Sequence, residues 1–165
     1  MSAQRSLEII RQALLLEKRG KTFYSKVAEH TQHSAVREFF SNMAAEEQEH
    51  IDLLLKHYKS LKEAGSFFTD VNEDPLKTAS EVVNGEIIEQ ITGADYESAA
   101  ISAAIHMEER AIKVYSERAE SATDAEEKKL YAWLAGWERS HLHQLLEIDR
   151  IVTERIWVDN NYWPF

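Results

Sequence analysis

The sequence predicts an all-α protein, a bundle of four long helices arranged as two helical hairpins joined by a long crossover. Only 5 Gly and 2 Pro occur among 165 residues, and Gly65, Pro75, Gly85 and Gly93 all lie in the middle of the chain. The flanking stretches carry apolar residues three and four apart, which is the spacing of an amphipathic helix. With 44% apolar residues, the chain can also bury a substantial core.

The first hairpin is predicted from about Ser6 to Ala64. Its first helix ends near His30, and its second begins at Ser34, a residue type that commonly caps helix N-termini. Gly65 is the natural C-terminal stop of this second helix. The link over residues 31–33 is short, so the two helices should be antiparallel neighbours.

The second hairpin is predicted from near Asp95 to about Glu154. Its first helix ends around Ser121, and Thr123-Asp124-Ala125-Glu126 fits a capping box at the start of its second helix. The crossover between the hairpins is too long for a turn and should carry a short helix around Ser80–Ile91. We divide the chain into a bundle, residues 1–155, and an aromatic C-terminal tail, residues 156–165, expected to pack on the bundle or a second subunit.

Charge and composition exclude several classes of protein. The net charge of −10 argues against nucleic-acid binding and against an anionic membrane surface. The absence of cysteine excludes disulfides, iron–sulfur clusters and thiol nucleophiles. The sequence shows neither a signal-peptide pattern nor an apolar run of the ~20 residues that a membrane span needs. We therefore expect a cytoplasmic protein without nucleic-acid or membrane partners.

The two hairpins are copies of one another. Sliding the sequence by 91 residues aligns residues 13–55 with residues 104–146 without a gap. The identical pairs are both apolar and polar, and they include Ala13 with Ala104, Glu17 with Glu108, Tyr24 with Tyr115, Ala44 with Ala135, Glu47 with Glu138, and His50 with His141. Unrelated amphipathic hairpins would share apolar spacing but not the polar identities. The sequence therefore predicts a bundle with a pseudo-two-fold axis.

The polar identities predict a two-metal site. Each half supplies a Glu-x-x-His pair on one helix face and a single Glu from the other helix. The six residues are Glu17, Glu47, His50, Glu108, Glu138 and His141. This is the donor set of the di-iron and di-manganese sites of four-helix bundles. Four carboxylates balance two divalent cations, and each imidazole adds one nitrogen donor. We expect the carboxylates of Glu47 and Glu138 to bridge the ions and those of Glu17 and Glu108 to cap one each.

A single Glu-x-x-His would be weak evidence, because a charge-rich helix contains one by chance. Its recurrence, each time 30 residues after a single Glu, makes the metal interpretation the stronger one. The repeat also selects Glu47, since Glu46 aligns with Trp137 and Glu49 with Ser140. By the same comparison it selects Glu108 rather than Glu109, which aligns with Lys18.

Several other residues carry two interpretations. Tyr24 and Tyr115 lie two turns after the single Glu of each half, and they either hydrogen-bond a ligand carboxylate or simply fill the core. Gly20 and Ala111 leave room either for an oxidant or for close helix packing. We expect structural or surface roles for the histidines that have no repeated partner: His30, His33, His57, His106 and His143. Trp133 and Trp137 are expected to be core or interface residues.

On these motifs the sequence resembles the ferritin-like superfamily, and most closely the erythrin domain of rubrerythrins, over about residues 6–150. The matching segments are Ala13–Glu17 with Phe23-Tyr24, Ala45–His50, Ala104–Glu108 with Val114-Tyr115, and Glu138–His141. The resemblance implies a non-haem centre of two iron ions, with manganese or mixed metals as alternatives. It also implies reaction with peroxide or dioxygen and a subunit that forms a homodimer.

Two departures from that family affect the expected function. Without cysteine the chain has no rubredoxin domain, so turnover would need an external electron donor. The family carries a further Glu three residues after the third-helix ligand, where this chain has Ala111. The predicted ligands are therefore more similar to the simpler four-Glu, two-His ligand set of bacterioferritin-like centres. The rival hypotheses are therefore a ferroxidase or iron-storage subunit, and a metal-free helical scaffold that binds a partner.

Overall fold

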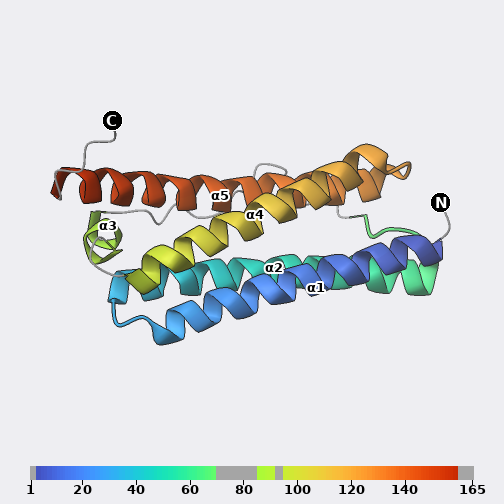
Figure 1. The fold of residues 1–165 in the computed structure, drawn as a ribbon. Coiled ribbons are helices and arrows are strands. Elements are labelled where there is room, and N and C mark those ends of the chain that lie inside the picture. The colour runs from blue at the N-terminus through green and yellow to red at the C-terminus, as the bar shows by residue number, and fades with distance from the viewer. Residues whose placement is uncertain (1–2, 70–84, 92–94, 160–165) are drawn as a thin grey trace.

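The computed structural model describes residues 3–69, 85–91 and 95–159. Helices α1 (Ala3–His30) and α2 (Ser34–Ala64) form one antiparallel hairpin, and α4 (Asp95–Ser121) and α5 (Ala125–Asp159) form the other. Figure 1 shows the two hairpins lying side by side as a bundle. A short helix, α3 (Gly85–Ile91), lies at the end of the bundle where α1 ends and α2 begins (Figure 1). The predicted all-α bundle of two hairpins with a helix in the crossover is confirmed.

The helix boundaries agree closely with the sequence-based ones. Gly65 ends α2 as predicted: its φ of 71° is left-handed, and its N–H donates to the Leu61 carbonyl. Helix α5 continues through Asp159, beyond the predicted end at Glu154. The expected start of the crossover helix, residues 80–84, and the last six residues of the aromatic tail lie outside the described residues.

Both predicted N-terminal caps are wrong by one residue. In α2 the N-cap is His33, which makes no side-chain cap hydrogen bond. The free Ala35 N–H instead donates to Gln90 Oε1 of α3 at 2.8 Å, so a tertiary contact replaces the local cap. In α5 the cap is Asp124, whose Oδ1 accepts from the N–H groups of Glu126 (2.9 Å) and Glu127 (3.0 Å).

The Asp124 cap replaces the predicted capping box of Thr123 and Glu126, and the residue three positions after this cap is Glu127. Its carboxylate accepts a hydrogen bond from Arg118 Nε at 3.0 Å, and this buried pair joins the end of α4 to the start of α5.

We expect Asp124→Ala to lower the free energy of unfolding by about 1 kcal/mol, the usual value of an N-cap. Urea denaturation of the variant beside Asp149→Ala checks this, and equal losses in both variants would contradict the role of the cap.

The core consists of two apolar clusters separated by a layer of charged side chains. One cluster contains Tyr24, Phe39, Phe40, Ile101 and Leu145, and the other contains Ile10, Leu54, Tyr115, Tyr131 and Leu134. In each of the four long helices, the predicted metal-binding residues lie between the segments that supply the two clusters. The bundle therefore holds these polar groups at its centre, with apolar packing on both sides.

Candidate metal centre

The structure brings together all six side chains that the sequence selected. Two overlapping groups, each with donor atoms within 4.8 Å of one another, are found among the described residues. One group contains Glu17, Glu47, His50 and Glu138, and the other contains Glu47, Glu108, Glu138 and His141. The carboxylates of Glu47 and Glu138 belong to both groups, whereas Glu17 and Glu108 belong to one each. Shared carboxylates between two adjacent cation positions are what a bridged two-metal site requires.

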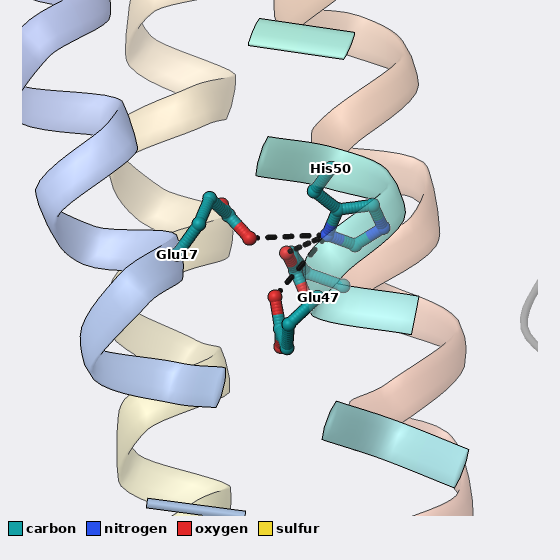
Figure 2. A group of neighbouring side chains, drawn as sticks. Glu17, Glu47 and His50 are labelled. Carbon is teal, nitrogen blue, oxygen red and sulfur yellow. Dashed lines mark hydrogen bonds and ion pairs between the residues drawn. The ribbon is translucent and has the colours of Figure 1, made fainter. Parts of the chain in front are cut away.

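In the first group, the Nδ1 atom of His50 is surrounded by carboxylate oxygens. It lies 3.1 Å from Glu17, 3.3 Å from Glu47 and 3.1 Å from Glu138. Figure 2 shows Glu17 reaching from α1 toward the imidazole of His50 on α2, with Glu47 one turn along the same helix. Because three helices supply oxygens to one nitrogen, these donors point at a common position.

The second group repeats this arrangement around His141. Its Nδ1 atom lies 3.1 Å from Glu138, 3.5 Å from Glu108 and 3.7 Å from Glu47. All six side chains are at most 3% exposed. Hard carboxylate oxygens and borderline imidazole nitrogens suit divalent iron or manganese. The donor set therefore fits two buried divalent cations.

The two tyrosines hydrogen-bond the single carboxylates across the bundle. Tyr24 on α1 donates to Glu108 on α4, and Tyr115 on α4 donates to Glu17 on α1. Both rings are fully buried. Each hydroxyl thus fixes the orientation of a carboxylate from the opposite hairpin. A hydrogen bond to a ligand carboxylate was one of the two interpretations of these tyrosines from the sequence. Helical spacing alone did not indicate that each bond joins one hairpin to the other.

In the metal-free protein, the pKa values of the clustered Glu and His side chains are strongly shifted. Burial, together with Glu138, raises the pKa of Glu108 to about 8 and raises the pKa of Glu47 well above its ordinary value. Burial alone would lower the pKa values of His50 and His141, but the carboxylates around them raise both. Burial opposes ionisation of Glu138 as well, yet the two imidazoles hold its pKa below the usual range. Without metal, protons therefore supply the positive charge that the carboxylates require.

Glu46 is a site residue that the repeat comparison did not find. Its Oε2 lies 2.7 Å from Nε2 of His141, and the carboxylate is buried. With Nδ1 of His141 directed at the clustered carboxylates, Nε2 carries the hydrogen and donates it to Glu46. A carboxylate behind a metal-binding histidine fixes the tautomer and orients the ring. The repeat comparison excluded Glu46 from the predicted ligands, and no sequence pattern indicated its contact with His141.

His50 has no carboxylate at the position equivalent to Glu46 in the repeat, because that position is occupied by Trp137. Trp137, which aligns with Glu46, packs edge-on against the His50 ring at 5.2 Å between ring centroids, and Trp133 packs at 5.7 Å. Among the described residues, Nε2 of His50 has no hydrogen-bond partner. The two halves of the site therefore share their donor atoms but differ in what supports each histidine.

We expect Glu46→Ala to weaken one metal position selectively. Loss of a carboxylate behind a histidine typically lowers metal affinity about 10–100-fold. Competition with a chelator should then resolve one tight and one weak cation per chain. Glu49→Ala, which removes an exposed carboxylate three residues further along α2, is the matched control. Two equally tight cations in Glu46→Ala would show that His141 needs no such support.

The remaining sequence-selected residues lie as follows. Gly20 faces Glu47, and a Cβ added there would lie 3.4 Å from Glu47 Oε1, an ordinary van der Waals contact, so the structure does not require glycine at this position. His57 is buried between Phe67 and Phe68. Burial lowers its pKa to about 4. His30, His106 and His143 are exposed, and none of these histidines belongs to the two groups found among the described residues.

Comparison with protein families agrees with this geometry. A family model described as Rubrerythrin matches residues 8–148, a range that covers most of the four long helices and contains the six clustered side chains. The chain belongs to the rubrerythrin family. No curated protein and no solved structure gives a significant match. Within the described part of this rubrerythrin, no helix is long and apolar enough to cross a lipid bilayer.

Proposed function

We propose that this rubrerythrin is a di-iron oxidoreductase that reduces a peroxide or dioxygen with electrons from an external donor. The proposal rests on the two overlapping groups of buried donors that share Glu47 and Glu138. When bound, two ferrous ions supply the two electrons that reduce one peroxide molecule, with two protons, to two molecules of water. The protein's own contribution is to hold the donors in place and to exclude bulk water.

The residues around the donors have separate roles in this proposal. His50 and His141 each offer one nitrogen through Nδ1, and Glu17 and Glu108 each offer a carboxylate held by a tyrosine hydroxyl from the opposite hairpin. Burial raises the pKa values of Tyr24 and Tyr115 well above the ordinary value, so both hydroxyls keep their protons and remain donors. Fixed donors allow the oxidation state to change with little movement of the protein.

Anaerobic mixing of the iron-loaded protein with hydrogen peroxide tests this function. We expect a fast change in near-ultraviolet absorption and the loss of two ferrous ions per peroxide consumed, measured with a ferrous-specific chelator. An added reductant should then sustain peroxide consumption beyond that amount. Glu49→Gln should behave as wild type. Bound iron that is oxidised no faster than free ferrous iron would overturn the proposal.

A ferroxidase or iron-storage role is the second candidate. Ala111 stands where the family resemblance leads us to expect a further carboxylate, and the two groups contain four Glu and two His. Iron oxidised here could then be passed on rather than re-reduced. Light scattering discriminates between the two functions. A large closed assembly that accumulates many ferric ions per chain would favour storage, and a homodimer that retains two would favour the oxidoreductase.

A further inference from the structure

A cavity of about 200 Å³ is lined mainly by residues of α1 and α4. Carboxylates of both groups of donors line it, including Glu17 and Glu108. The exposed residues Arg19 and Arg110 line it as well, so the cavity reaches the surface. A molecule that enters this cavity from solvent therefore approaches the candidate metal centre.

Leu16 and Met107 occupy equivalent positions in this cavity. They are 91 residues apart, and each directly precedes the single ligand Glu of its half, Glu17 or Glu108. Both residues line the cavity, and both are partly buried. The two positions thus match in place and exposure but differ in chemistry, because a leucine side chain has no group comparable to the oxidisable thioether of methionine.

Met107 differs from the other methionines in its surroundings. The chain has three methionines. Met43 is 3% exposed and belongs to an apolar core cluster, and Met1 lies outside the described residues. Of the two methionines in the described part of the chain, Met107 is the one that lines the cavity over the clustered carboxylates. Its thioether is therefore placed where an oxidant would pass.

We propose that Met107 is a modification site, and that peroxide entering this cavity in excess of the electron supply oxidises its thioether to the sulfoxide. One peroxide oxygen forms the new S–O bond as the O–O bond breaks, and the other oxygen leaves as water with both protons. The sulfur gives up the two electrons, so the step needs no further reductant. Methionine sulfoxide is polar and can be reduced again, so the modification is reversible.

The inference rests on the proposed function, because the metal centre is what draws peroxide into the cavity. A reactant held beside a side chain reacts faster than the same reactant in bulk solution. Met107 should therefore be oxidised faster than its partial burial alone would allow. A methionine outside the cavity, even a more exposed one, has no such advantage.

Peptide mass spectrometry of the iron-loaded protein, fully oxidised before a limited exposure to hydrogen peroxide, tests this. The variant Val114→Met supplies a reference thioether on the same helix, at a position that is 45% exposed and does not line the cavity. Trypsin places positions 43, 107 and 114 in different peptides. We expect position 107 to gain one oxygen at least about threefold faster than position 114. Met43 should stay unmodified.

The double variant Leu16→Met/Met107→Leu moves the thioether to the equivalent position of the other half. We expect it to bind two iron ions and to gain one oxygen at position 16, at a rate close to that of position 107 in the wild type. The single variant Met107→Leu is the matched control, and it should gain no oxygen at either position.

Three results would contradict the inference in distinguishable ways. Oxidation at position 107 no faster than at position 114 would mean that solvent exposure alone decides, and it would overturn the inference. A double variant that stays unmodified at position 16 would overturn the role of the cavity. Either result leaves the proposed function standing if peroxide still oxidises the ferrous protein, whereas ferrous protein that peroxide does not oxidise would overturn both.

Discussion

Glu47→Gln should reduce the metal content from two ions per chain to at most one and should also make the metal-free protein more stable. The first effect follows from the position of Glu47, whose carboxylate belongs to both groups of donors. An amide is a far weaker metal ligand than a carboxylate. Replacing Glu47 by Gln therefore removes one strong ligand from each of the two cation positions. Elemental analysis after dialysis against trace metal measures this directly.

The stabilising effect follows from the charge of Glu47 in the metal-free protein. Burial, with the neighbouring Glu138, raises the pKa of Glu47 well above its ordinary value, so ionisation of this carboxyl costs free energy in the folded protein. Glutamine has nearly the same shape and no charge, which removes that penalty. Replacing buried ionic groups often stabilises a protein by roughly 1–3 kcal/mol. For a chain of this size that corresponds to about 3–10 °C in Tm.

Calorimetry in the presence of a chelator checks the metal-free stability, with Glu49→Gln as a control at an exposed position of the same helix. The control should keep both ions and the wild-type Tm. Two tightly bound ions in Glu47→Gln would contradict the shared-ligand role of Glu47. A metal-free Glu47→Gln protein less stable than wild type would contradict the repulsion among the carboxylates.

The fold and the six clustered side chains could be predicted because both follow from local spacing and repetition. Breaker-free amphipathic segments define the helices, and two copies of one hairpin must place equivalent residues around the same axis. That is why Glu47 and Glu138, 91 residues apart, meet at the centre of the bundle. The same symmetry brings Arg19 and Arg110 to one cavity.

The features that were missed depend on contacts between helices that no local pattern encodes. Glu46 has no repeated partner, and it supports His141 only because α2 and α5 face one another. Ser34 and Thr123 are suitable cap residues, but Gln90 of α3 satisfies the start of α2 and Asp124 satisfies that of α5. Tertiary packing decides among alternatives that are close in local energy.

Between pH 6.5 and 8.5, the metal-free protein should become less stable as the pH rises. The folded-state pKa of Glu108 is about 8, above its ordinary value of 4.5, and the pKa values of Glu47, His50 and His141 are also raised. The folded protein therefore holds protons that the unfolded chain has already released. Stability from such groups is complete at low pH and is lost as the pH rises through their folded-state pKa values.

Ionisable groups whose folded-state pKa is lowered change the stability only outside this pH range. The pKa of Glu138 is lowered below its ordinary value of 4.5, so its contribution changes only in more acidic solution. The pKa of His57 falls from 6.5 to about 4, so its contribution is lost only below pH 6.5. A metal-free Tm that rises between pH 6.5 and 8.5 would therefore contradict the proton-filled site.

Metal should reverse this pH dependence, because cations and protons compete for the same donors. Each ion present at about 1,000 times its Kd adds about 4 kcal/mol, so two ions add about 8 kcal/mol. This corresponds to an increase in Tm of about 15–30 °C for a chain of this length. The increase should be largest at pH 8.5, where fewer protons compete with the cations for the donors, and smallest near pH 5.5. Calorimetry of chelated and reloaded protein across that range measures it, and a Tm unaffected by metal at every pH would contradict a two-metal centre formed by these six side chains.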